Sequence, residues 1–385
     1  MAIKKRKILY ISGTRADYGL MKETLLAIQN SSLLKLEIIV TGMHLMSQFG
    51  NTINEVKKDK FIIHKANVTY ENDDKESTAN FIGKFVQQLI GKIEKIKPDI
   101  ILVLGDRAEM LTTAVVGAYL AIPVAHIHGG DISGTVDDIA RHTITKLSHI
   151  HFPATKKSAE RIIKMGEESS RVHIVGSPGI DNILNFNLPS SEVIAKRYKL
   201  DLLKPVLIVV QHPAEMEVKE TKENMEETML SIKELGYQTI VIYPNADAGG
   251  REIIKIIEKY RKYSFIRIYK NISRIDYLGL LKISSVMIGN SSSGIIEAPF
   301  FHLPVVNIGS RQTGRERADN IIDVDYKKMD IKKAVQKSLF DKKFKEQVKK
   351  CKNPYGGDIK TGHQITKVLS EIKIEDKLLQ KKLSY

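Results

Sequence analysis

Short apolar segments alternate with amphipathic helical patterns along most of the chain, and this alternation restricts the folds that the chain can adopt. The apolar segments of the first half span residues 7–12, 37–42, 99–105, 123–130, 150–155 and 172–176. Strands that are apolar on both faces and joined by crossover helices are typical of a parallel sheet buried between helices. The pattern restarts after residue 185, with segments at 206–213, 238–245, 265–270, 284–289 and 304–309. The sequence therefore predicts an α/β protein with two doubly wound, Rossmann-like domains.

The length of 385 residues also favours two domains over one. We expect an N-terminal domain over 1–184, a linker over 185–204 and a second domain over 205–360. The final stretch, 361–385, has a helical pattern, and it could return to pack on the first domain.

The formal net charge of +15 at first suggests a nucleic-acid-binding protein. The lysines, however, are scattered along predicted helix faces and concentrate only at 341–350 and 376–383, which is typical of a solvated surface. No zinc-ligand spacing, helix-turn-helix signature or RNP-like aromatic run accompanies the charge. The excess of positive charge therefore favours an anionic small substrate, with no nucleic-acid partner.

Neither the amino-terminal segment nor the cysteine content points to a membrane or to secretion. The apolar run before Ser12 is too short for a signal peptide or a membrane span. The single cysteine, Cys351, excludes an intramolecular disulfide and suits a reducing compartment. We expect a cytoplasmic protein with no membrane partner.

Charged side chains follow the predicted strands of the first domain. In open parallel sheets, ligands bind beyond the carboxyl ends of the strands, so these residues are the first candidates for a site. Arg15 and Asp17 follow the first strand, and Asp106 and Arg107 follow the third. The Asp106 carboxylate comes directly after an apolar run, where its proton affinity can be tuned. An aspartate there would equally well cap the helix expected at 108–120, and both interpretations stay open.

Two histidines, His126 and His128, alternate along one predicted strand, so we expect their side chains to share a face, with Asp131 three residues further on. Such a pair could ligate zinc, or it could provide an acid/base group with an orienting carboxylate. No third ligand has an obvious spacing, so the sequence favours a site without metal. A buried, hydrogen-bonded histidine is the simpler alternative.

The segment 134–146 predicts a helix that begins with two aspartates, Asp137 and Asp138. Arg141 and His142 lie one turn later, so a carboxylate, a cation and an imidazole can face the same side. Aspartates at a helix start are commonly caps, which would explain one of the pair. Asp137 then remains a candidate for proton transfer.

The second domain has its own polar residues at strand ends. Three serines and a glycine follow the strand at 284–289, a pattern that indicates a diphosphate site because small side chains leave backbone N–H groups accessible. Glu297, one turn later, can accept ribose hydroxyls, and Arg311, Arg315 and Arg317 supply positive charge. The alternative is a serine-rich turn that only links two elements. The candidates in this domain are His212, Asn245, Asp247, Ser291, Ser292, Ser293, Gly294, Glu297 and Arg315.

With these motifs in order, the chain resembles the hydrolysing UDP-N-acetylglucosamine 2-epimerases of sialic-acid synthesis and their relatives in legionaminic-acid synthesis. The motifs that carry the resemblance are SGTRADYG (12–19), GDRAEM (105–110), HIHGGDISGTVDDIARHTITKLSH (126–149), VGSPGIDNI (175–183), QHP (211–213), YPNADAGG (243–250), GNSSSGIIEAP (289–299) and GSRQTGRE (309–316). The resemblance implies a two-domain glycosyltransferase-B type fold, a sugar nucleotide held between the domains, and no metal or redox cofactor. It also makes a homodimer or homotetramer reasonable.

The reaction implied by the resemblance is elimination of UDP to a glycal, followed by addition of water that gives the 2-epimer as free sugar. Asp106 and Asp137 resemble the family's acid/base carboxylates, and His212 resembles its cleft histidine. Arg15 resembles the phosphate-side arginine, and Glu297 the ribose-binding glutamate. Arg107, Arg141, Asn245 and Asp247 are further candidates for contact with substrate.

His128 departs from the family pattern, because many members have HIEGG where this chain has HIHGG. Histidine relays protons near neutral pH, so activity is still expected. The change bears on the substrate, which is either UDP-N-acetylglucosamine or UDP-2,4-diacetamido-2,4,6-trideoxy-glucose. A glycosyltransferase that uses a UDP-sugar is the second enzyme class, and a non-catalytic nucleotide-sugar sensor is a further alternative. The clustered acid/base residues favour elimination over both.

Overall fold

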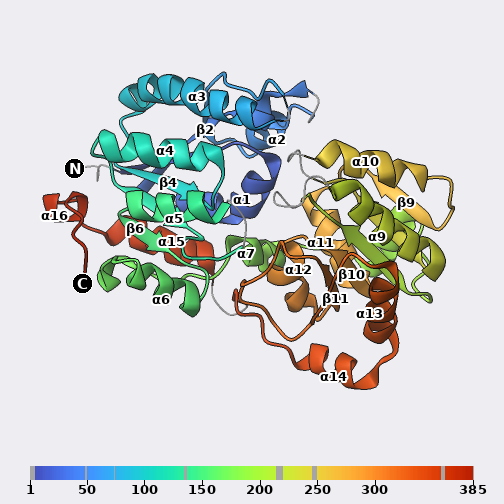
Figure 1. Ribbon diagram of the computed structural model, residues 1–385. Coiled ribbons are helices and arrows are strands. Elements are labelled where there is room, and N and C mark those ends of the chain that lie inside the picture. Colours follow the sequence, from blue (N-terminus) through green and yellow to red (C-terminus); the bar gives the residue numbers. More distant parts are fainter. Residues whose placement is uncertain are drawn as a thin grey trace. The chain divides into compact units, whose positions relative to one another are not determined.

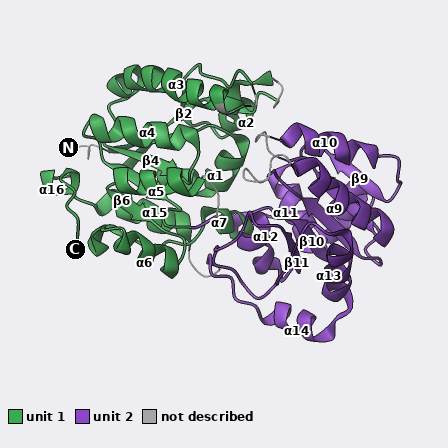
Figure 2. Ribbon diagram, viewed as in Figure 1, with its two compact units in different colours: residues 1–131, 136–184, 358–385 green, residues 132–135, 185–357 purple. Residues whose placement is uncertain are grey.

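The computed structural model describes residues 5–47, 50–72, 74–133, 137–213, 220–244, 249–356 and 360–384. These residues form two compact α/β units, each built around a six-stranded parallel sheet (Figures 1 and 2). Unit 1 comprises residues 1–131, 136–184 and 358–385, and unit 2 comprises residues 132–135 and 185–357. The prediction of two doubly wound, Rossmann-like sheets is confirmed.

The sheet of unit 1 has the strand order β3-β2-β1-β4-β5-β6. Its strands are β1 (Arg6–Ser12), β2 (Leu34–Val40), β3 (Ile62–Lys65), β4 (Ile100–Leu104), β5 (Val124–Ile127) and β6 (Ile150–Phe152). Its helices are α1 (Arg15–Gln29), α2 (Ile53–Lys58), α3 (Lys75–Ile96), α4 (Ala108–Tyr119), α5 (Asp137–Leu147), α6 (Lys156–Lys164), α7 (Pro178–Asn185), α15 (Thr361–Glu371) and α16 (Asp376–Leu379). The order reverses between β1 and β4, so the loops that follow these strands flank the switch point where such sheets bind ligands.

Strand β1 shows why these segments form a buried parallel sheet. Ile8 and Tyr10 pack into one apolar cluster, and Leu9 and Ile11 pack into another. Because successive side chains point to opposite faces, each face of the sheet is covered by helices. The continuous apolar run in the sequence is the direct consequence of this double burial.

The sheet of unit 2 has the order β12-β11-β10-β7-β8-β9. Its strands are β7 (Val206–Val210), β8 (Gln238–Ile242), β9 (Ile266–Tyr269), β10 (Val286–Gly289), β11 (Val305–Ile308) and β12 (Ile321–Val324). Its helices are α8 (Ser191–Tyr198), α9 (Thr221–Leu235), α10 (Gly250–Lys259), α11 (Arg274–Ile283), α12 (Ser293–Ile296), α13 (Lys328–Phe340) and α14 (Lys342–Lys350). The switch point lies between β7 and β10, and the serine loop follows β10.

Three segments differ from the sequence prediction. The edge strands β3 and β12 were not predicted, because both are short and partly exposed and so lack an apolar run. The segment at 172–176, predicted as a strand, forms only one isolated bridge, between Val172 and His151. It follows the edge of β6 through backbone bonds such as His173 N–H to the His151 carbonyl, 2.9 Å. Apolar composition alone did not distinguish this extended segment from a strand.

The end of the chain returns to unit 1. Helix α15 packs against α1, and a Cβ on Gly362 would lie 2.9 Å from the Cα of Thr24, so only glycine fits this close approach. The backbone N–H groups of Thr361 and Gly362 donate to Asp181, at 2.9 and 2.6 Å. The returning helix is thus held by both packing and a carboxylate cap.

Residues 185–204, predicted as a linker, contain α8, which is held in unit 2. The carboxylate of Asp276, at the start of α11, accepts hydrogen bonds from Arg197 and from the hydroxyl of Tyr198, the latter at 2.9 Å.

Among the helices that the structure describes, none combines the length and apolarity needed to span a bilayer.

Candidate functional site

The loop between β1 and α1 is shaped by Asp17. Its carboxylate accepts hydrogen bonds from the backbone N–H groups of Gly13 and Thr14, at 3.0 and 2.7 Å, and from the hydroxyl of Ser12. Thr14 caps α1 and completes a capping box with Asp17. Since its own loop provides these donors, Asp17 holds the loop, and its predicted contact with substrate stays a prediction. Arg15, the first residue of α1, keeps its side chain 30% exposed at this edge.

A second buried carboxylate, Glu109, lies beneath the same loop. A Cβ on Gly13 would lie 2.3 Å from Glu109 Oε1, so glycine is required where the loop crosses this side chain. Glu109 accepts a hydrogen bond from the Tyr70 hydroxyl at 2.9 Å, and Arg107 Nε lies 3.3 Å from its other oxygen. Arg107, predicted to bind substrate, is therefore anchored by a carboxylate and remains partly exposed, at 32%.

Asp106 follows β4 and forms an ion pair with the buried guanidinium of Arg141. Arg107 is the N-cap residue of α4, and its side chain makes no capping hydrogen bond. Arg141 also pairs with Asp138 and donates to the Asp131 carbonyl at 3.1 Å. Burial alone would lower the pKa of this guanidinium, but the three surrounding aspartates raise the pKa above its ordinary value. Arg141 therefore stays charged and fixes the Asp106 carboxylate.

Two aspartates begin α5. The carboxylate of Asp138 pairs with Arg141. Asp137 is the first residue of α5, and its predicted role in proton transfer stays a prediction. The carboxylate of Asp138 and the guanidinium of Arg141 are brought together, as the spacing implied, and the expected place of the His142 imidazole on the same side stays a prediction.

The histidines of HIHGG do not share a strand face, which corrects the sequence prediction. Strand β5 ends at Ile127, and His128 has a left-handed backbone with a φ of 63°. His126 is fully buried, with Nε2 2.8 Å from the Gly105 carbonyl and Nδ1 3.2 Å from the Thr145 hydroxyl. Burial lowers the pKa of His126 to about 3, so its ring is neutral. Both nitrogens are engaged within the protein, so the two histidines do not form a metal-binding pair.

His128 carries the orienting carboxylate that the sequence suggested. Its Nδ1 lies 3.3 Å from Asp131 Oδ2, and its Nε2 lies 3.1 Å from the hydroxyl of Ser177. Asp131 is 3% exposed and is itself held by the Ser158 hydroxyl at 2.6 Å. The Asp131 carboxylate can accept a hydrogen bond from the Nδ1–H group of His128. In the neutral ring, Nε2 is then the nitrogen with the lone pair. This arrangement suits a group that takes up and releases protons.

In unit 2, Glu297 lies at the centre of a buried polar cluster. It is 3% exposed, pairs with Arg274 and accepts a hydrogen bond from the Ser293 hydroxyl at 2.5 Å. The hydroxyl of Tyr277 donates to Ser293 Oγ at 2.6 Å. A carboxylate has about four acceptor sites, so Glu297 retains capacity for the two hydroxyls of a ribose.

The serine loop is tighter than the sequence suggested. The helix that follows it, α12, has only four residues, and the backbone N–H of Ser293 donates to Ser291 Oγ at 3.3 Å. A Cβ on Gly294 would lie 3.0 Å from a methyl group of Val305, so this glycine permits close packing on β11. Ser292 is the residue before α12. The predicted binding of diphosphate by this loop therefore rests on the loop and on nearby arginines, since a single helical turn has little dipole.

The segment 311–317 supplies those arginines. Arg311 Nη1 donates to the Asn290 carbonyl at 3.2 Å, and Arg317 is taken up by Asp323 in a bidentate pair at 2.7 and 2.8 Å. Arg315 differs, because its Nε and Nη1 are buried and have no hydrogen-bond partner among the residues that the structure describes. Buried guanidinium nitrogens without acceptors are costly, so a bound anion would satisfy them.

His212 is anchored after β7 by a reciprocal pair of hydrogen bonds with Asn290, whose side chain accepts from the His212 N–H at 2.7 Å and donates to its carbonyl at 2.9 Å. Burial, reinforced by the charge of Arg311, lowers the pKa of His212 to about 3. Its imidazole is therefore neutral near pH 7. Asn245 and Asp247, predicted to bind substrate, lie outside the described residues.

The model of the family described as UDP-N-acetylglucosamine 2-epimerase matches residues 26–370 of this chain. The chain belongs to this family.

Curated relatives agree with the family. A UDP-N,N'-diacetylbacillosamine 2-epimerase (hydrolyzing) of Legionella pneumophila is 42% identical over 99% of this chain and 100% of its own length. A UDP-N-acetylglucosamine 2-epimerase of Neisseria meningitidis is 36% identical over 88% of this chain and 89% of its own. A crystal structure of the Neisseria meningitidis UDP-GlcNAc 2-epimerase bound to UDP-GlcNAc has a TM-score of 0.80, with 18% identity over 95% of this chain and 98% of that one. The likeness in structure confirms the two-domain, glycosyltransferase-B type α/β fold.

Several residues that build these candidate sites were given no role by the sequence analysis. They are Glu109 in unit 1, and Arg274, Tyr277 and Asn290 in unit 2. Arg274 and Tyr277 belong to the first turn of α11, the helix that follows β9, so they lie at the same carboxyl edge as the serine loop. Inspection of helix starts as well as strand ends would have found them.

Proposed function

We propose that this protein is a hydrolysing 2-epimerase that converts UDP-N-acetylglucosamine to N-acetylmannosamine and UDP. Family membership supports the reaction class. The observation that carries the proposal is the group of side chains at the carboxyl edge of the unit 1 sheet, where the Asp106–Arg141 pair and the His128–Asp131 pair follow adjacent strands. A glycosyltransferase or a nucleotide-sugar sensor would not need two such carboxylate-bearing pairs.

The proposed reaction needs residues that bind the nucleotide and residues that transfer protons. The C2 proton of the sugar is not acidified by a neighbouring carbonyl, so the C1–O bond to the diphosphate must weaken first. Positive groups such as Arg315 and Arg15 would stabilise the departing diphosphate, a task suited to preorganised charges. Glu297 would hold the ribose, in keeping with its remaining acceptor capacity.

Proton transfer falls to the unit 1 residues. One of Asp106, His128 and Asp137 would take the C2 proton as the C1–O bond breaks, which leaves a glycal and UDP. Water would then add across the double bond, with its oxygen at C1 and a proton at C2 on the opposite face. The products are the free 2-epimer and UDP. His212, neutral near pH 7, would also contact the sugar nucleotide.

A second candidate substrate is UDP-N,N'-diacetylbacillosamine, which two of the relatives carry in their names, at 42% and 37% identity. His128 stands where many family members have glutamate, and this difference supports the second candidate substrate. A relative named for UDP-N-acetylglucosamine is 36% identical to this chain, which is close to these values. Sequence identity alone therefore does not separate the two substrates.

We expect incubation with UDP-N-acetylglucosamine in heavy water to release UDP and a free sugar that carries deuterium at C2. Proton abstraction followed by protonation from solvent requires this label, and NMR of the released sugar detects it. Parallel incubation with UDP-N,N'-diacetylbacillosamine identifies the substrate by comparison of kcat/KM. A released sugar without label would contradict the elimination route, and transfer of the sugar to an added acceptor would favour a glycosyltransferase.

We also expect His128→Gln to lower kcat by about 10²-fold or more, because the amide cannot take up a proton. His128→Glu should retain more activity than His128→Gln, since glutamate restores a titratable group at this position. Steady-state kinetics with both variants make the comparison. Equal activity of the glutamine variant and the parent would exclude a proton-transfer role for His128.

A further inference from the structure

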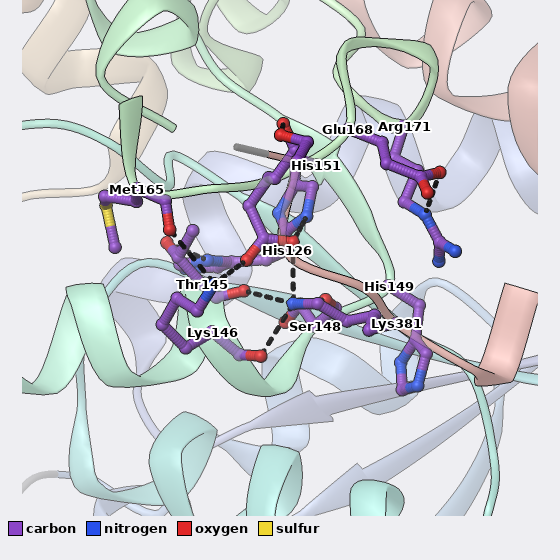
Figure 3. Close-up of polar contacts among 12 residues, drawn as sticks. His126, Thr145, Lys146, Ser148, His149, His151, Met165, Glu168, Arg171 and Lys381 are labelled. Atoms are coloured by element: carbon purple, nitrogen blue, oxygen red, sulfur yellow. Dashed lines mark hydrogen bonds and ion pairs between the residues drawn. The ribbon is translucent and has the colours of Figure 1, made fainter. Parts of the chain in front are cut away.

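The last residues of the chain contact the carboxyl end of the helix that carries Arg141. The ammonium group of Lys381 donates to the carbonyls of Lys146 and Ser148, at 2.6 and 2.7 Å, at the end of α5. Figure 3 shows Lys381 among Thr145, Lys146 and Ser148. The last carbonyls of a helix lack partners within the helix and carry partial negative charge, so a cation here both caps and stabilises α5.

A buried carboxylate fixes the ammonium group in this position. Glu167, 1% exposed, pairs with Lys381 at 2.7 Å and with Lys146 at 2.6 Å, and it accepts a hydrogen bond from His151 Nε2 at 3.1 Å. Burial lowers the pKa of Lys381, and the charge of Glu167 opposes that shift. Because Glu167 has two other partners, loss of Lys381 does not leave it as an unpaired buried charge.

The rest of the tail is held at separate points. Arg171 donates to the carbonyls of Leu378 and Lys377, at 2.6 and 2.7 Å. The backbone N–H of Ser384 donates to the Gly166 carbonyl at 3.1 Å. The tail therefore crosses the end of α5 in a defined path, with Lys381 between these two anchors.

A hydrogen-bonded path leads from this end of α5 to the candidate acid/base residues. Thr145, at the contact with the tail, has its hydroxyl 3.0 Å from the carbonyl of Arg141 and 3.2 Å from His126 Nδ1. The other nitrogen of His126 lies 2.8 Å from the carbonyl of Gly105, the residue before Asp106. The neutral His126 ring donates from Nε2, since a carbonyl only accepts, which leaves Nδ1 as an acceptor. The single proton of the Thr145 hydroxyl is donated either to the Arg141 carbonyl or to His126 Nδ1, so these two contacts alternate. The same turn of α5 thus contacts the tail, Arg141 and the loop of Asp106.

We propose that Lys381 is a positioning residue, which fixes the last turns of α5 so that Arg141 holds the Asp106 carboxylate in its reactive place. The effect on turnover rests on the proposed function. The inference that the tail restrains α5 does not rest on the proposed function.

The test replaces Lys381 with methionine, which keeps the length of the side chain and removes its charge and donors. Lys382→Met is the matched control, because Lys382 is the exposed next residue of the same tail. We expect Lys381→Met to lower kcat by about 3- to 30-fold with KM within about twofold, because a misplaced catalytic group loses turnover more than binding. Lys382→Met should match the parent in both constants.

Hydrogen exchange provides the readout that does not depend on the reaction. Amides of α5 should exchange about tenfold faster in Lys381→Met than in Lys382→Met, because the helix end opens more often. Unchanged exchange in α5, or a kcat equal to that of the control, would overturn the proposal. If Lys381→Met does not fold, Lys381→Gln, which keeps a polar donor, is measured in the same way and judged by the same outcomes. If the parent releases no sugar from either substrate, the proposed function fails, and the exchange comparison still decides whether the tail restrains α5.

Discussion

Asp106→Asn is expected to lower kcat by about 10²- to 10⁴-fold, the usual contribution of a general acid or base. The amide keeps the size of the side chain but cannot exchange a proton, and it loses the charge that pairs with Arg141. Binding of UDP should change by less than about twofold, because Asp106 is assigned to proton transfer and not to the nucleotide. Steady-state kinetics give kcat, and calorimetric titration with UDP gives the affinity.

Asp99→Asn is the matched control for this variant. Asp99 precedes β4, whereas Asp106 follows it, so the two aspartates lie at opposite ends of one strand. Asp99 accepts a hydrogen bond from the Lys7 N–H at 2.6 Å, which an asparagine carbonyl can also accept. We expect this variant to keep the kcat of the parent. A parallel loss of kcat and UDP affinity in Asp106→Asn would instead indicate that Asp106 only supports the structure of the loop.

The sequence was sufficient to predict the two sheets because most of their strands are buried on both faces. A segment such as 100–104 must be apolar throughout when helices cover it on each side, and this constraint is visible without coordinates. Edge strands carry no such constraint, which explains why β3 and β12 were not predicted.

The candidate site was only partly accessible from the sequence, because its partners are set by tertiary contacts. The position of Asp106 after a strand suggested a functional carboxylate, but only the tertiary structure shows that Arg141 pairs with it. His128 was expected to share a face with His126, and the left-handed backbone at His128 changed that. Periodicity assumes a regular strand, so it fails at the residue where the strand ends.

The contact of Lys381 with α5 had no signal in the sequence. It joins positions more than 230 residues apart, and its acceptors are backbone carbonyls, which every residue possesses. A lysine-rich tail was interpreted as a solvated face, and most of its lysines fit that description. Only the fold shows that Lys381 is partly buried against a helix end.

Glu297→Gln is expected to have the opposite effect to Asp106→Asn. The amide can still accept from Ser293, but it loses the charge that pairs with Arg274 and that would bind ribose hydroxyls. A charge-assisted hydrogen bond contributes about 1.5–3 kcal/mol, so the Kd for UDP should rise about 10- to 100-fold. At saturating substrate, kcat should fall by less than about fivefold, because the proton-transfer residues belong to unit 1.

Calorimetric titration with UDP and with uridine separates the possible causes of this loss. If Glu297 contacts the ribose, affinity for both ligands should fall by the same factor, since both contain the two ribose hydroxyls. Loss of affinity for UDP alone would indicate that Glu297 acts on the diphosphate through Arg274 and Ser293. Glu258→Gln serves as the control, because Glu258 is an exposed glutamate of unit 2 with its own arginine partner, Arg261. Unchanged UDP affinity in Glu297→Gln would exclude Glu297 from the nucleotide site, and with it the part of the proposal that assigns UDP binding to the cluster after β10.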